Sequence, residues 1–448
     1  MRGKLIEESV LFVSVLKWVF LASVVGLIVG ISTAVFLKLL DWAITRATSF
    51  SLYFLILPAA LFVSALLVRL WEPESGGYGP EKVIEAVHKK SGKINIAVVP
   101  SKLTATILTA AAGGSVGQVG PCAQIGAALA SASAGLIRFD DTDRKKLVIC
   151  GISAGFASVL GAPIAGAIFG VEVLSVGSIM YEVLLPSFVA GITSYHVSSL
   201  LGITYLHLPL KSVPSFSESF FLVSALAGLF FGLCSVLFIE AMRLGKKFAA
   251  IFQWWDPLKG LAGGIILIPL AFLFSTDYMG LGVKTIHEAL QGDVIPWYAF
   301  PLKAITTSVT FAFGGTGGII APIIFSGTMA GNLFGGLLGL DRGIFAAMGF
   351  VGMLAGAANT PIAMSILAVE LFGSSIAPYA AVVCVISFLM TGHRGIFATQ
   401  RLTLRKSASM DVEMGKEIGE VRTEFRPRRK SVIGIAANWA KKTDKKDS

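Results

Sequence analysis

Residues 113–121 read GGSVGQVGP and residues 314–322 read GGTGGIIAP, and these two stretches decide the fold. Each lies in an apolar window without Asp, Glu, Lys or Arg, at residues 103–137 and 304–340. Each window exceeds the ~20 residues of a spanning helix, yet its glycines and closing proline predict a helix break. Broken backbone at membrane depth is tolerated where protein or a water-filled cavity satisfies its polar groups. Two such breaks predict an internal polar pathway, with two kinked, tightly packed helices as the alternative.

The two stretches belong to a duplication. They align at an offset of 201 with four identities in nine. At an offset of 198, APIAGAIFGVEVL (162–174) aligns with TPIAMSILAVELF (360–372), with six identities in thirteen. Broken elements at corresponding positions of two repeats indicate a central binding site in a transporter. The repetition therefore favours the pathway over the kinked helices.

The composition excludes a soluble enzyme. Of the 448 residues, 54% are hydrophobic and 14% are charged, whereas soluble domains carry about 25% charged residues. We expect an N-terminal cytoplasmic segment (1–15), two halves of one membrane domain (16–210 and 211–400) and a tail (401–448). The tail holds thirteen Lys or Arg and seven Asp or Glu. The positive-inside rule predicts that it is cytoplasmic and contacts lipid surface, not nucleic acid.

Other features of the chain indicate neither a cleaved signal peptide nor a metal site. Glu7 and Glu8 argue against a signal peptide, so we expect a cell-membrane protein that retains its N-terminus. The five histidines show no metal-binding spacing, and we predict neither a metal nor a cofactor. Four isolated cysteines are expected to be small packing residues; they are Cys122, Cys150, Cys234 and Cys384.

Helices that begin inside a membrane favour anions. Their first amide groups are unpaired and their dipoles are positive at that end, so an anion binds without lysine or arginine. Neither glycine-rich stretch contains an acidic residue of the kind that a cation pore uses. The sequence therefore predicts passage of chloride or another small anion.

Four motifs carry a resemblance to a known family. GQVGP (117–121) is similar to G-[KR]-E-G-P, GIIAP (318–322) to GxFxP, and GGYGP (76–80) to GSGxP. The stretch GHRGIFATQ (392–400) is similar to a late segment that carries a pore tyrosine. Taken in their order along this duplicated chain, beginning with 76–80, the motifs resemble those of the CLC chloride channels and proton-coupled chloride transporters over roughly residues 20–400.

The resemblance implies an all-α membrane fold of about eighteen tilted and broken helices in two inverted repeats. It also implies a homodimer with one pore in each subunit. Chloride would lie where helix N-termini meet near the midplane, bound mainly by backbone. The positions that match the family's anion-binding motifs are Gly76, Gly77, Gln118, Val119, Gly120, Ile319, Ile320, Ala321 and Phe397.

Departures from the family pattern decide the predicted mechanism. The gating glutamate of the family falls at Val119, and the glutamate for internal proton transfer falls at Val173. A proton route through a membrane needs groups that ionise, so we predict a passive, uncoupled anion channel. A proton-coupled antiporter that uses a substitute acid is the alternative. A fluoride exporter is disfavoured, because that branch generally keeps the gating glutamate.

Two coordinating hydroxyls of the family are also replaced. Its serine aligns with Gly77 and its tyrosine with Phe397. Ser75 and Tyr78 carry nearby hydroxyls, although we expect neither to substitute. Losing two neutral hydrogen bonds of ~1 kcal/mol each weakens anion binding and selectivity. Phe397 is alternatively a hydrophobic constriction.

Three polar side chains within apolar sequence need separate interpretation. Glu172 and Glu370 occupy equivalent repeat positions, and an intramembrane carboxylate is a functional candidate by default. We favour a structural role, in which each caps a broken helix of its own half. Ser153 lies in a GxSxG pattern typical of hydrolases. Because no positioned His and Asp accompany it, we expect a turn that allows close helix packing, and no enzyme.

Overall fold

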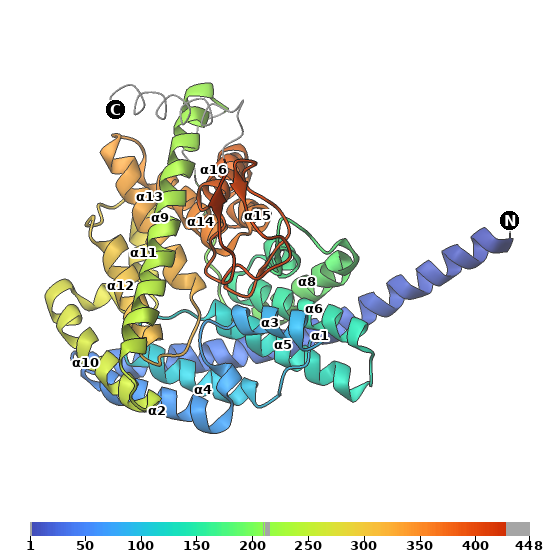
Figure 1. Cartoon of the computed structure of the whole chain (residues 1–448), viewed down its shortest axis with the longest axis horizontal. Helices are drawn as coiled ribbons and strands as arrows, with labels where there is room; N and C mark the ends of the chain where they lie inside the picture. The colour runs from blue at the N-terminus through green and yellow to red at the C-terminus, as the bar shows by residue number, and fades with distance from the viewer. Residues whose placement is uncertain (1, 209, 211–215, 427–448) are drawn as a thin grey trace, which may run out of the picture.

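The computed structural model describes residues 2–208, 210 and 216–426. Within them the chain forms sixteen α-helices, five short 3-10 helices and four two-residue strands (Figure 1). Seven of the thirteen Lys and Arg residues of the tail predicted to contact lipid, from Arg428 onward, lie outside the described residues. The all-α membrane fold expected from the sequence is confirmed.

The first half contains eight helices, which are α1 (Arg2–Thr48), α2 (Leu57–Trp71), α3 (Pro80–Lys89), α4 (Val98–Ala111), α5 (Val119–Leu136), α6 (Asp141–Leu160), α7 (Pro163–Glu172) and α8 (Leu184–Leu200). The second half contains α9 (Glu218–Ile251), α10 (Asp256–Phe274), α11 (Val283–Gln291), α12 (Ala299–Ala312), α13 (Ile320–Leu337), α14 (Arg342–Ala358), α15 (Pro361–Phe372) and α16 (Ala377–Met390). The 3-10 helices are η1 (Tyr53–Ile56), η2 (Pro73–Ser75), η3 (Tyr181–Val183), η4 (Thr276–Tyr278) and η5 (Ser374–Ile376). Each helix of the first half thus has a counterpart in the second.

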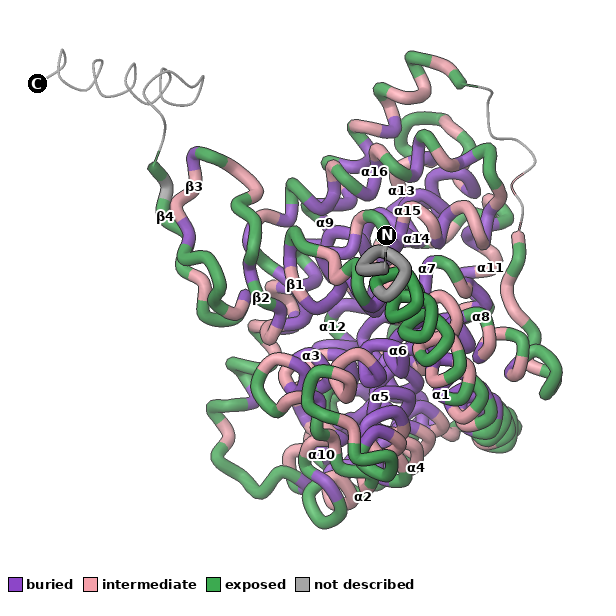
Figure 2. The backbone as a smooth tube through the Cα atoms, turned by 90° about the vertical axis from the view of Figure 1, so that its right-hand side faces the viewer, coloured by how far each residue is buried: buried purple, intermediate pink, exposed green. Residues whose placement is uncertain are grey.

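Seven helices of the described chain are long and apolar enough to cross a membrane. They include α1, α2, α9 and α10, which expose apolar side chains around a buried centre of α5, α6 and α13 to α15 (Figure 2). Residues 2–15, expected as a separate segment, continue directly into α1, whose N-terminal part projects from the bundle (Figure 1).

Both predicted helix breaks are present and have the same construction. After α4 the chain turns at Gly113, whose φ is +94°, and after α12 it turns at Gly314, whose φ is +97°. Glycine adopts this left-handed region without the steric cost that other residues meet. The next helix then begins at Val119 or Ile320, with a proline in its first turn, where a missing N–H leaves no bond unmade.

Reciprocal hydrogen bonds join the two breaks. The amide of Gly117 donates to the carbonyl of Gly318, and the amide of Gly318 donates to that of Gly117, each at 2.7 Å. The Ser115 amide also donates to the Thr310 hydroxyl at 3.2 Å, and the Thr316 amide to the Thr109 hydroxyl at 3.3 Å. Such exchanged contacts are the mark of a two-fold relation, which here relates the two repeats.

A short segment after α16 packs back on the membrane domain. Strand β2 (Arg401–Leu402) pairs in parallel with β1 (Ser175–Val176), which follows α7. Strand β3 (Met410–Asp411) pairs antiparallel with β4 (Glu424–Phe425). Lys406 fixes this segment by donating to Asn359 Oδ1 and to the Phe388 carbonyl, each at 2.7 Å.

Candidate anion pathway

Three helix N-termini meet at the centre of the molecule, those of α3, α5 and α13. None has a hydrogen-bonding side-chain cap. The amides of residues 118–120 and 319–321 donate no hydrogen bond to any group in the described part of the chain. Unpaired amides and converging positive dipole ends make this junction an anion site that depends on backbone alone.

Two glycines allow the junction to close. A Cβ atom on Gly120 would lie 2.3 Å from the Tyr78 carbonyl oxygen, and one on Gly79 would lie 2.4 Å from the Gly120 carbonyl oxygen. Real Cβ atoms do not approach backbone so closely. The α3 and α5 termini are therefore in contact only because both positions are glycine.

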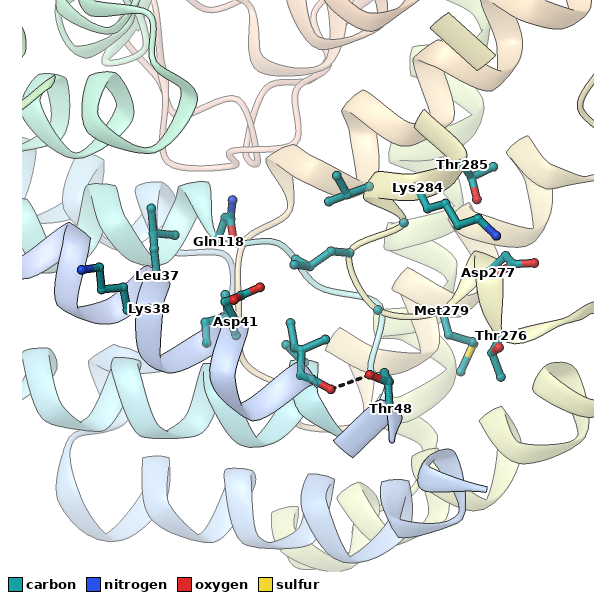
Figure 3. Close-up of a pocket in the computed structure, with 18 of the residues that line it drawn as sticks. Leu37, Lys38, Asp41, Thr48, Gln118, Thr276, Asp277, Met279, Lys284 and Thr285 are labelled. Carbon is teal, nitrogen blue, oxygen red and sulfur yellow. Dashed lines mark hydrogen bonds between the residues drawn. The ribbon is translucent and has the colours of Figure 1, made fainter. Parts of the chain in front are cut away.

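A cavity of about 620 Å³, here called the α1-side cavity, reaches the junction at Gln118. In Figure 3, Lys38 and Asp41 of α1 lie across it from Asp277 and Lys284. A smaller space of about 200 Å³, also lined by Gln118, is bordered by Val119 and Ala321 and is mostly apolar. Its lining contains no carboxylate.

A second cavity of about 710 Å³, here called the α9-side cavity, shares no lining residue with the α1-side cavity. It reaches the turn before α3 at Tyr78 and includes residues of the 410–423 segment. Its basic lining residues are Arg243, Lys246, His393 and Arg394, and its lining contains no carboxylate. The α9-side cavity is therefore basic, whereas the α1-side cavity mixes both signs.

The structure gathers most of the predicted anion-binding positions. Gln118, Val119 and Ala321 border the α1-side spaces, while Gly120, Ile319 and Ile320 are buried at the junction. Gly76 is half-buried and Gly77 is exposed, beside the α3 turn. Phe397 is fully buried and lines neither of the two large cavities nor the apolar space, and Val173 is also fully buried.

Glu172 and Glu370 do cap helices, but not those of their own half, so that prediction is wrong. Glu172, at the end of α7, accepts hydrogen bonds from the amides of Ile362 and Ala363 at 3.0 and 2.8 Å. Glu370 accepts from Ile164 and Ala165 at 2.9 and 2.8 Å. The reason is that α7 and α15 lie side by side, so each carboxylate meets the start of the opposite helix.

Sequence reasoning overlooked a pair of buried lysines. Lys102 Nζ, fully buried, donates to the carbonyls of Ser75 and Gly77 at 3.0 and 2.7 Å. Lys303, also fully buried, donates to the carbonyls of Tyr278 and Gly280 at 3.2 and 2.7 Å. The two lysines are 201 residues apart, the same offset as the two glycine-rich stretches. This match could have identified them from the sequence. Each ammonium fixes the turn before a short helix, α3 or α11.

Ser153 lies within α6, not in the turn that we expected. It is fully buried, and its small side chain allows α6 and α7 to approach closely. This approach brings its hydroxyl to the Ala167 carbonyl, to which it donates at 3.3 Å. The four cysteines are buried and free. The described residues contain no group of three His, Cys, Asp or Glu side chains suited to a metal.

Comparison with known proteins agrees with this geometry. Residues 59–392 match the family model described as "Voltage gated chloride channel". The chain belongs to the CLC family. Transport of anions across a membrane is the activity of this family, which places the chain among multi-pass membrane transporters and channels.

Individual CLC proteins resemble this chain over most of its length. The "Chloride/fluoride channel protein" of Pseudomonas syringae pv. tomato is 34% identical, covering 88% of this chain and 89% of the relative. The "H(+)/Cl(-) exchange transporter ClcA" of Klebsiella pneumoniae is 26% identical, covering 79% and 80%. A crystal structure of a CLC-type fluoride/proton antiporter superposes with a TM-score of 0.82 at 26% identity, covering 86% and 98%.

Proposed function

We propose that this protein is a passive anion channel of the CLC type, which conducts chloride and other small anions without moving protons. The observation that carries the proposal is Val119, the first residue of α5, which borders the small apolar space beside the junction. An aliphatic side chain neither ionises nor competes with an anion for the amide groups. The outer end of the pathway therefore lacks a charged plug.

The second expected proton station is also aliphatic. Val173 is fully buried at the end of α7. No carboxylate lines the apolar space at Val119 or the α9-side cavity. A proton crossing the membrane needs successive groups that gain and lose charge, and the pathway offers none at these two positions.

The two intramembrane carboxylates are poor substitutes for the missing acids. Both oxygens of Glu172 and both of Glu370 accept backbone hydrogen bonds. Two backbone hydrogen bonds hold each carboxylate in a fixed position. A proton carrier must instead release its partners during each cycle, which supports the passive mechanism over an antiporter built on these residues.

A second candidate substrate is fluoride. It is favoured by two comparisons, the chloride/fluoride channel protein at 34% identity and the fluoride/proton antiporter structure at a TM-score of 0.82. The junction binds through backbone amides, which are good donors to either halide. We therefore propose fluoride as an alternative permeant anion of the same passive pathway.

The test is efflux from proteoliposomes under an imposed anion gradient, with valinomycin and no proton ionophore. Chloride or fluoride is recorded with an ion electrode while pH is recorded in parallel. We expect anion release without proton movement. Proton uptake in a fixed ratio to anion release contradicts the proposal, and the faster of the two anions identifies the preferred substrate.

The variant Val119→Glu sharpens this test. A carboxylate at the first residue of α5 faces free amide groups and competes with the anion. We expect anion efflux to become pH-dependent, falling several-fold as pH rises through the carboxylate pKa, still without coupling because Val173 is unchanged. Val159→Glu is not a suitable control because Val159 also lines this space; Val385→Glu, on the exposed surface of α16, is the matched variant.

We further propose that the protein is a homodimer in the cell membrane with the C-terminal tail in the cytoplasm. This part rests on the family resemblance and on the excess of basic residues in the tail. Mass measurement by light scattering in detergent tests the dimer. Labelling of a cysteine introduced near the C-terminus with an impermeant reagent tests the orientation.

A further inference from the structure

The α9-side cavity holds a tyrosine that the sequence comparison gave no role. Tyr78 is 3% exposed and lines this cavity. Its hydroxyl has no hydrogen-bond partner in the described part of the chain, and its ring is held edge-on against Phe311 at 4.9 Å between centroids. The hydroxyl oxygen itself is not buried, so it is accessible to a partner in the cavity. Tyr78 directly precedes Gly79, the residue before α3.

Lys246 of α9 lies over the same ring, with Nζ 4.5 Å from the ring centroid. The two arginines of the cavity share one carboxylate, because Arg243 and Arg394 both pair with Glu240, at 2.9 and 3.2 Å. No described carboxylate forms an ion pair with Lys246, although Glu81 in the first turn of α3 interacts with it electrostatically. Lys246 therefore remains available to an anion in the cavity.

We propose that Lys246 and Tyr78 form an anion-capture site in the α9-side cavity, one step before the helix junction. The ligand is a small monovalent anion that accepts hydrogen bonds from the ammonium and the phenolic hydroxyl. It then passes to the unpaired amides of the α3 and α5 termini. This inference rests on the proposed function, since it adds a recognition step to the same anion pathway.

The duplication provides an internal contrast for this site. The turn before α11, residues 279–283 (MGLGV), corresponds to residues 76–80 (GGYGP) and borders the α1-side cavity. Leu281 stands where Tyr78 stands in the first half, and it carries no donor. The capture site is thus present at one mouth only. Anion entry from the α9 side should depend on Lys246 and Tyr78, whereas entry from the α1 side should not.

The test compares Lys246→Met and Tyr78→Phe with the matched control Lys247→Met. Lys247 is the adjacent exposed lysine of α9 and does not line the cavity. Anion current is recorded in planar bilayers as the anion concentration is varied on one face at a time. We expect Lys246→Met to raise the half-saturating concentration about five- to tenfold from the α9-side face, as loss of a steering charge does. Tyr78→Phe should raise it about two- to fivefold, and Lys247→Met should have no effect.

Equal behaviour of Lys246→Met and Lys247→Met overturns the capture site, as does an equal shift from both faces. If the wild type moves protons with anions, the passive mechanism fails while a one-sided shift in Lys246→Met still supports the site. If no current is measurable, chloride binding to the protein in detergent is measured by calorimetry. Weaker binding in Lys246→Met than in Lys247→Met supports the site, and unchanged binding overturns it.

Discussion

The turn before α3 and the turn before α11 share their construction and differ in their chemistry. In both, a buried lysine holds two carbonyls, and glycines at equivalent positions have positive φ, +73° at Gly77 and +54° at Gly280. Only the first turn carries a tyrosine hydroxyl and lies under a lysine ammonium, that of Lys246. The repeats therefore supply the same scaffold twice, whereas the chemistry of each mouth comes from residues that break the symmetry.

The largest expected effect comes from exchanging residue types at the junction. Gly120 and Ala321 are equivalent in the two repeats, and a Cβ on Gly120 would lie 2.3 Å from the Tyr78 carbonyl oxygen. Gly120→Ala should reduce anion efflux by about 100-fold, the cost of displacing a site by ~1 Å. Ala321→Gly should retain most of the efflux measured in proteoliposomes.

Gly135→Ala is the control for Gly120→Ala in the same helix. A Cβ on Gly135 meets no atom within 4 Å, so this variant should conduct like the wild type. If Gly120→Ala conducts equally well, the α3 and α5 termini do not need their close contact.

An intermediate effect is expected from the buried lysines. Lys102→Met and Lys303→Met each remove an amine donor and leave two carbonyls unpaired. Loss of the bonds that hold each turn beside the pathway should reduce current at low anion concentration about three- to tenfold. Lys102→Met should act on entry from the α9 side, and Lys303→Met on entry from the α1 side.

One-sided application of anion in planar bilayers measures this difference. Identical effects of the two lysine variants from both faces would show that the two turns serve one common step. Thermal unfolding of both variants in detergent separates a change in conduction from a loss of folded protein.

The smallest expected effect is the loss of protein stability when either capping carboxylate, Glu172 or Glu370, is replaced. Glu172 is 6% exposed and Glu370 is less buried. A glutamine presents at most one acceptor to the two amides. We therefore expect Glu172→Gln to lower the free energy of unfolding by about 2 kcal/mol and Glu370→Gln by about 1 kcal/mol. Denaturation in detergent, followed by circular dichroism, measures both.

Conduction provides the second measurement for the carboxylate variants. If the carboxylates are structural, folded Glu172→Gln and Glu370→Gln should conduct without a change in pH dependence. A loss of pH response or of proton movement in either variant would assign it a transport role.

The sequence predicted the breaks and the duplication because both follow from local residue types. Gly113 and Gly314 need a positive φ, and the prolines permit a helix to begin a few residues later. The same glycines align at one offset. Backbone-based sites are predictable in this way, since they depend on where a helix begins and not on distant partners.

Features that depend on contacts between the halves were not predictable. The partners of Glu172 and Glu370 are 190 to 206 residues away, so sequence position placed them in the wrong half. Tyr78 was considered only as a replacement hydroxyl and set aside, because nothing in the sequence brings Lys246 of α9 over its ring. Phe397 was assigned to the pore by motif alignment; it is fully buried, and its pore role stays a prediction.

The exchange of carboxylates between α7 and α15 has a consequence for biosynthesis. The amides of Ile164 and Ala165 are synthesised 205 to 206 residues before the Glu370 carboxylate that they bind. At 5–20 residues per second, the ribosome takes about 10–40 s to cover that distance. During this interval the start of α7 lacks its partner and must be satisfied by water, lipid headgroups or the insertion machinery. The first half is therefore inserted early but can complete its structure only when the second half is nearly finished.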